Sequence, residues 1–110
     1  MATARKILGQ NKPAASTDAT LYTVPASTDT VVSTITVAET GGATATFRIC
    51  VDASGGTTTA AGKAIAWNVA LAANQTLTFT LGITLAAAAT VVIQASTANV
   101  TFTAFGQENS

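Results

Sequence analysis

The stretch Gln75-Thr-Leu-Thr-Phe-Thr-Leu81 decides the fold, because apolar and polar side chains alternate along it without a break. A period of two is typical of a β-strand with one buried face and one exposed face. The pattern places Leu77, Phe79 and Leu81 on the buried face and the intervening threonines on the other. It therefore predicts a strand that covers one side of a hydrophobic core.

The same alternation recurs along the chain and predicts further strands. The predicted inward sets are Ala45, Phe47, Ile49 and Val51; Val31, Ile35 and Val37, with Ser33 as a polar interruption; Ile65, Trp67, Val69 and Leu71; and Val100, Phe102 and Ala104. Weaker strands are expected around Arg5–Gly9, Thr20–Val24 and Thr90–Ala95. Short strands in such a series predict an all-β chain, a single antiparallel β-sandwich or jelly-roll-like domain of about seven to eight strands.

The segments between these strands have the composition of turns. The pair Gly41-Gly42 tolerates positive φ angles and predicts a tight hairpin, and Ala72–Asn74 predicts a second short hairpin connection. Pro25 closes a strand because it has no N–H to donate. The Gly- and Thr-rich segment Ala53–Lys63 is expected to be the longest exposed loop. Ala86–Ala89 is interpreted as a turn or a single helical turn, since Gly82 before it and β-branched residues after it disfavour a helix.

The length of 110 residues fits one domain spanning residues 1–110, with residues 1–18 as a possible N-terminal arm. The first residues contain no apolar run long enough for a signal peptide, so synthesis and assembly in a cytoplasm are expected. Threonine interrupts the charge-free run from Ala64 to Gln107 too often for a membrane-spanning helix.

Charged residues are scarce. They make up 9% of the chain, against about 25% in an ordinary soluble domain, and the formal net charge is zero. A neutral surface promotes association, so this composition suits a subunit of an assembly better than a free monomer. A monomer of low charge remains the alternative interpretation.

The sequence offers little for catalysis. Histidine is absent, which excludes Ser-His-Asp and Cys-His sites, and no zinc-ligand spacing or phosphate-binding glycine loop occurs. We therefore expect no enzyme, no cofactor and no metal site. The single cysteine, Cys50, excludes an intramolecular disulfide. It is interpreted as a small residue in a second buried layer or at an interface, with a reactive thiol as the alternative.

Three of the five cationic residues, Arg5, Lys6 and Lys12, lie in the first twelve positions. They are candidates for contact with an acidic partner subunit, although a merely solvated chain end would have the same composition. The cluster is short and has no interleaved aromatic residues, so nucleic-acid binding is not expected. Trp67 and the phenylalanines are interpreted as core residues, which leaves little support for an aromatic sugar-binding platform.

The order of segments resembles that of small virion structural proteins from tailed bacteriophages, including those that infect cyanobacteria. The resemblance is carried by Lys6-Ile-Leu-Gly-Gln10, Leu21-Tyr-Thr-Val-Pro25, Val31-Val-Ser-Thr-Ile35, Thr46-Phe-Arg-Ile-Cys-Val51, Leu81-Gly-Ile-Thr-Leu85 and Val100-Thr-Phe-Thr-Ala-Phe-Gly106. It implies a β-sandwich that assembles on a virion, and it transfers no catalytic residue.

Within a virion, the first hypothesis is a capsid decoration (cement) protein, a homotrimer that binds the major capsid protein between capsomers. The second is a tail, neck, baseplate or receptor-binding component, and a carbohydrate-binding β-sandwich is the alternative outside virions. No membrane partner is expected in any of these roles.

Overall fold

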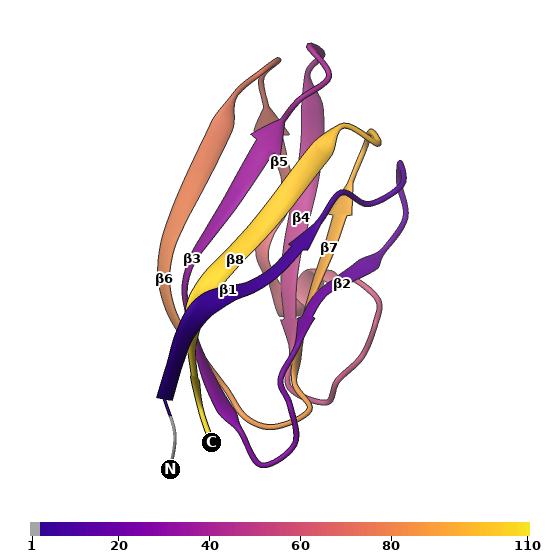
Figure 1. Cartoon of the computed structure of the whole chain (residues 1–110). Helices are drawn as coiled ribbons and strands as arrows, with labels where there is room; N and C mark the ends of the chain where they lie inside the picture. The colour runs from indigo at the N-terminus through magenta and orange to yellow at the C-terminus, as the bar shows by residue number, and fades with distance from the viewer. Residues whose placement is uncertain (1–2) are drawn as a thin grey trace.

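The chain folds into eight β-strands and one short 3₁₀ turn, shown in a computed structural model that describes residues 3–110 (Figure 1). The elements are β1 (Thr3–Asn11), β2 (Ala19–Thr23), β3 (Asp29–Glu39), β4 (Ala45–Asp52), η1 (Ala61–Lys63), β5 (Ala64–Leu71), β6 (Thr76–Leu85), β7 (Thr90–Ala95) and β8 (Val100–Asn109).

The strands form two four-stranded antiparallel sheets that face each other. One sheet has the order β1-β8-β3-β6 and the other has the order β2-β7-β4-β5. Consecutive strands thus mostly belong to opposite sheets, which is the arrangement of an eight-stranded jelly roll. The predicted all-β sandwich is confirmed.

The core fills the space between the sheets and is built from the inward members of each alternation. Phe47 of β4 lies at its centre, with the ring centroids of Phe79 and Phe102 at 5.9 and 6.2 Å in edge-to-face geometry. Aromatic pairs prefer this geometry because the positive edge of one ring meets the negative face of the other. The strict alternation of β6 is confirmed, since Leu77, Phe79 and the following apolar residues pack against the core.

The two predicted hairpins are wrong. Gly41-Gly42 and Ala72–Asn74 both lie in connections that cross from one sheet to the other. The first joins β3 to β4 and the second joins β5 to β6, and in each case the two strands belong to different sheets. Gly42 does have the positive φ expected of it, at 77°. The buried Glu39 carboxylate joins both crossings by accepting N–H groups from Gly41, Gly42 and Asn74 at 2.8–3.1 Å. These hydrogen bonds lower the pKa of Glu39, and the one from the Asn74 N–H has the largest effect.

Two β-bulges overturn part of the predicted inward sets. In β3, the register shifts between Val32 and Thr34, so Val32 is fully buried and Val31 lies on the outer face beside Ser33. In β5, the register shifts opposite Arg48, so Ala66 is buried while Ile65 and Trp67 are each 37% exposed. An extra residue in one strand interrupts its period of two and turns the preceding side chains to the other face.

The long loop after β4 covers part of the outer face of its own sheet. It ends in η1, and the ion pair between Lys63 Nζ and Asp52 Oδ2 at 2.6 Å closes it. Cys50 lies beneath this loop with 0% exposure, and its Sγ is 3.6 Å from the carbonyl oxygen of Ala60. The interpretation of Cys50 as a residue of a second buried layer is confirmed. Ala86–Ala89 forms a turn, with Ala88 at a φ of 71°.

Candidate functional site

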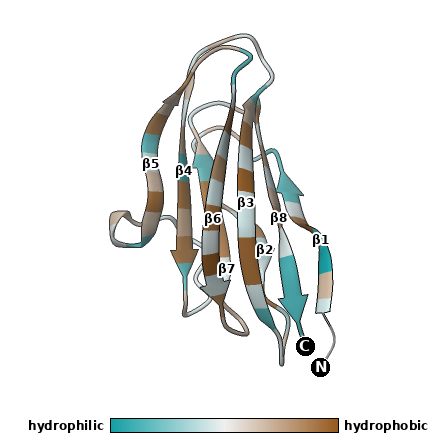
Figure 2. Ribbon diagram, turned by 90° about the vertical axis from the view of Figure 1, so that its left-hand side faces the viewer, coloured by the Kyte–Doolittle hydropathy of each residue, from teal (hydrophilic) through white to brown (hydrophobic). Residues whose placement is uncertain are grey.

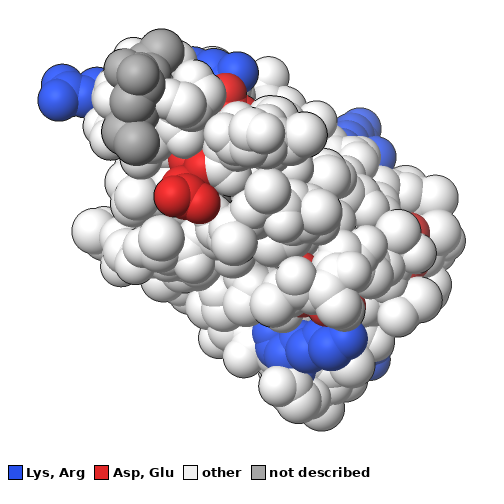
Figure 3. All heavy atoms as spheres, turned by 90° about the horizontal axis from the view of Figure 1, so that it is seen from below, with Lys and Arg blue, Asp and Glu red and all other residues white. Residues whose placement is uncertain are grey.

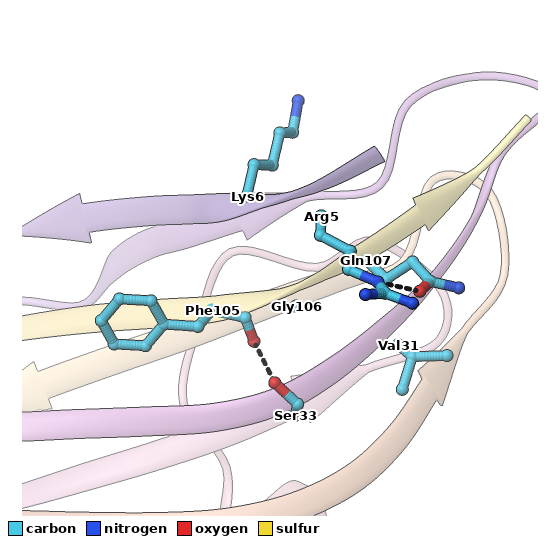
Figure 4. Close-up of a pocket in the computed structure, with 7 residues that line it drawn as sticks. All are labelled: Arg5, Lys6, Val31, Ser33, Phe105, Gly106 and Gln107. Atoms are coloured by element: carbon cyan, nitrogen blue, oxygen red, sulfur yellow. Dashed lines mark hydrogen bonds between the residues drawn. The ribbon is translucent and has the colours of Figure 1, made fainter. Parts of the chain in front are cut away.

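The predicted contact residues Arg5 and Lys6 lie on β1, the edge strand paired with β8. Both residues contribute to the lining of one cavity, but as neighbours on a strand they direct their side chains to opposite faces. Arg5 lies on the outer face, where its Nε is 3.5 Å from the Gln107 Oε1 atom. The Lys6 side chain points away from Arg5 and Gln107 (Figure 4). The strand expected at Arg5–Gly9 is confirmed, whereas the use of residues 1–18 as an arm stays a prediction.

A shallow cavity of about 570 Å³ opens on the outer face where β1, β8 and β3 run together (Figure 4). Phe105 and Val31 supply its apolar surface, and Arg5 and Gln107 supply the polar rim. A side chain at Gly106 would collide with the Val31 carbonyl oxygen, so glycine lets the two strands approach there. Ile7, 52% exposed, pairs with Phe105 across the strands and enlarges the apolar patch.

Lys6 belongs to a polar network at the end of the sandwich. Its Nζ forms an ion pair of 2.7 Å with Glu108, whose other carboxylate oxygen accepts the hydroxyl proton of Tyr22. The Tyr22 hydroxyl also lies 2.8 Å from Thr30 Oγ1. Burial and the neighbouring Glu108 carboxylate raise the pKa of Tyr22 to about 12. The hydrogen bonds from Lys6 and Tyr22 lower the pKa of Glu108. Lys6 therefore already has a structural role.

Lys12 lies apart from the other two predicted contact residues. It follows the last residue of β1 and is exposed. It lies six positions after Lys6 along extended chain, a span of about 20 Å. It forms no ion pair with any other residue of the described range 3–110. The structure thus brings Arg5 and Lys6 onto one strand and leaves Lys12 at its far end, and a partner contact at any of the three stays a prediction.

A second exposed cluster surrounds Trp67 on the outer face of the β2-β7-β4-β5 sheet. The Arg48 guanidinium carbon lies 4.0 Å from the centre of the Trp67 ring, and Arg48 Nε donates to the Asn68 side-chain oxygen at 2.8 Å. Sequence reasoning placed Trp67 in the core because its period-two neighbours are apolar. The only signal for the outward position is Asn68 itself, a residue type that tolerates a positive φ.

Asp18 supports the Arg48 cluster from the loop before β2. Its Oδ1 accepts hydrogen bonds from Thr59 Oγ1 at 2.7 Å and from Gln94 Nε2 at 2.9 Å. Burial opposes ionisation of Asp18, yet these hydrogen bonds and the charge of Arg48 leave its pKa below the usual value. The polar groups around Trp67 therefore hold one another in place.

Across residues 3–110 no group of three or more Cys, Asp or Glu side chains is placed to hold a metal ion. Within the same residues no helix is long and apolar enough to cross a membrane. Charged side chains are few and scattered over the face seen from below (Figure 3).

Comparison with known proteins gives a match at the level of the fold. No protein-family model matches the chain, and no curated protein sequence is similar to it. The chain superposes on a chain of infectious bursal disease virus, Gx strain, with a TM-score of 0.57 and 12% sequence identity, over 97% of this chain and 32% of the viral chain. It matches a chain of the T13 particle of the same virus with a TM-score of 0.55 and 14% identity, over 96% and 30% of the two chains.

The chain shares its fold with a protein of a virus particle. It spans about a third of the length of the viral chains. At this identity the likeness concerns the architecture and not individual residues.

Proposed function

We propose that the protein is a non-enzymatic structural component of a virion, and specifically a decoration protein on the outer capsid of a tailed bacteriophage. The observation that carries the proposal is the jelly roll, which resembles a virus-particle protein over 97% of the chain. The neutral, charge-poor composition supports it, because such surfaces promote association. The protein would bind the major capsid protein between capsomers and stabilise the head after assembly in the host cytoplasm.

The mechanism would be thermodynamic. A ligand that binds the assembled shell and not the separated subunits stabilises the shell by mass action. The outer-face patch of Ile7, Phe105 and Val31, with Arg5 at its rim, offers apolar area together with a cation for an acidic capsid residue. Aromatic residues and arginine are enriched in protein interfaces, whereas other charged residues are depleted there.

The test adds purified protein to shells of the encoding virus that lack it, and measures co-sedimentation and the temperature of DNA release. We expect saturable binding and a higher release temperature. Arg5→Gln should weaken binding at least fivefold. The control Thr58→Glu, on the distant loop, lowers the net charge by the same one unit and should leave binding unchanged. Lys12→Gln tests the third predicted cation separately. Co-sedimentation with tails only, or no binding at all, would overturn the decoration role. Binding to tails would favour a tail, neck, baseplate or receptor-binding component.

A second candidate function is carbohydrate binding, and the exposure of Trp67 favours it. Aromatic rings on an outer sheet face can stack on sugars, and Trp67 is 37% exposed. However, Arg48 already covers its ring, and the polar neighbours are bonded to one another. A glycan array would decide: reproducible binding that Trp67→Ala abolishes would support this function, and an array without hits would remove it.

A further inference from the structure

The edges of the two sheets differ in how they are protected. An unpaired strand edge invites pairing with another chain, and proteins block it with charges, bulges or short strands. β1 carries Arg5 and Lys6 and a register shift at Leu8, β2 has only five residues and a register shift, and β5 has the bulge at Asn68. Three of the four edges are therefore blocked.

The fourth edge, β6, is neither short nor charged. It has a register shift against β3, where Thr80 and Ile83 lie opposite Thr34 and Val32, but unlike β5 it has no residue with a positive φ and its alternation is not interrupted. It runs for ten residues from Thr76 to Leu85 and contains no charged residue and no proline. It stands last in the order β1-β8-β3-β6, so within residues 3–110 it has one pairing partner, β3. Its exposure alternates strictly along the strand, which shows that β6 keeps a regular period of two although β3 beside it does not. β6 is thus a long, uncharged edge along which exposure alternates regularly.

The apolar side chains of β6 are incompletely covered. Leu77, Phe79, Leu81 and Ile83 point inward and pack against the core, yet all four remain partly exposed. By contrast, Val37 and Phe102 on the interior strands of the same sheet have 0% exposure. In the view from the β6 side, apolar bands alternate with paler ones along the ribbon of β6 (Figure 2). The core is therefore open along this edge.

The sequence of β6 identifies the partner. The segment Thr76–Thr84 reads T-L-T-F-T-L-G-I-T and is nearly symmetric about Thr80. If a second copy of β6 pairs antiparallel with Thr80 opposite Thr80, then Thr76 faces Thr84, Leu77 faces Ile83, and Phe79 faces Leu81. Every threonine then meets threonine or glycine, and every apolar residue meets an apolar residue, which is the matching that stabilises cross-strand pairs.

We propose that the protein forms a two-fold symmetric dimer in which the β6 edges of two copies pair antiparallel. The pairing joins their two four-stranded sheets into a single eight-stranded sheet. In such a two-fold pair each copy contributes its β6 edge, so no β6 edge is left to bind a third copy. The inference goes beyond the virion role and does not depend on it. It replaces the trimer expected from the sequence with a dimer.

The test measures the molar mass of the full chain by sedimentation equilibrium for three forms: wild type, Thr76→Lys with Thr84→Lys, and Thr76→Lys with Thr84→Glu. In the proposed register, position 76 of one copy faces position 84 of the other. Two lysines should therefore repel across the edge and lower the association constant at least tenfold. In the lysine–glutamate form, the lysine at position 76 of each copy faces the glutamate at position 84 of the other, so two attractive pairs form and association should be at least as strong as in the wild type. Both double variants change the same two exposed positions, so each serves as the control for the other.

Three outcomes would overturn the proposal: a wild-type monomer at millimolar concentration, a trimer, or equal association of the two double variants. Circular dichroism of each variant checks that the sandwich is folded. Because the measurement uses the isolated protein, its failure leaves the shell-binding test unaffected, and the reverse also holds.

Discussion

Single residues at the centre of the core determine how tightly the two sheets hold together. Phe47 is 1% exposed and contacts aromatic rings from β6 and β8, so Phe47→Ala removes contacts with both strands. We expect a loss of about 3–5 kcal/mol in the free energy of unfolding, measured by urea denaturation. The same change at Phe105 on the outer face should cost about 1 kcal/mol or less. Equal losses at both positions would contradict this placement of the core.

Tyr22 is the only tyrosine, so absorbance at 295 nm during an alkaline titration reports its ionisation alone. We expect a midpoint near its pKa of about 12 in the folded protein and near 10 in urea. Glu108→Gln removes the carboxylate charge beside the phenol and should move the folded midpoint downward. Fluorescence of Trp67, the only tryptophan, verifies that the protein stays folded during the titration. A folded midpoint near 10 in the wild type would contradict the Tyr22–Glu108 hydrogen bond.

At the residue scale, the sequence predicted most inward positions and failed at two places for one physical reason. Alternation gives the face of a side chain only while the strand keeps a period of two. The bulges beside Ser33 and at Asn68 each break that period, so Val31 and Trp67 lie outside although their neighbours suggested the core. Because the Trp67–Arg48 cluster exists only through the second bulge, this part of the candidate site could not be predicted.

At the scale of the element, β5 owes its shape to Asn68, whose φ is 51°. Asn68→Gly and Asn68→Val both remove the side-chain bond to Arg48, so the difference between them isolates the backbone. Glycine adopts a positive φ freely, whereas a β-branched residue is strained there. We expect the valine variant to unfold with a free energy about 1–3 kcal/mol lower than the glycine variant. Equal stabilities in urea denaturation would show that the bulge relaxes without strain.

The strands themselves were predictable, but their pairing was not. Alternation along Gln75–Leu81 depends on residues close in sequence, whereas the choice between a hairpin and a crossing depends on partners far away. Gly41-Gly42 suits both connections, since each needs a positive φ. The buried Glu39, which accepts hydrogen bonds from both crossings, is the residue whose role requires the three-dimensional fold.

The pH dependence of stability belongs to the whole molecule, because it sums all titrating groups. The chain has no histidine, the side chain that ordinarily changes charge between about pH 5 and 8. The carboxylates of Glu39, Asp52 and Glu108 have pKa values below their usual range in the folded state, Asp52 mainly through Lys63. Tyr22 has a raised pKa of about 12. Folding should therefore be insensitive to pH across a wide neutral range and sensitive at both ends.

The signs at the two ends are opposite. Below about pH 4 the unfolded carboxylates bind protons before the folded ones, so stability falls as the pH drops toward the folded pKa values. Above about pH 10 the unfolded tyrosine loses its proton first, so stability falls as the pH rises toward 12. Urea denaturation from pH 2 to 11 should give a plateau with two descending limbs. Asp52→Asn should flatten the acid limb and Tyr22→Phe the alkaline limb, each leaving the other unchanged; a maximum confined to one neutral pH would contradict this assignment of groups.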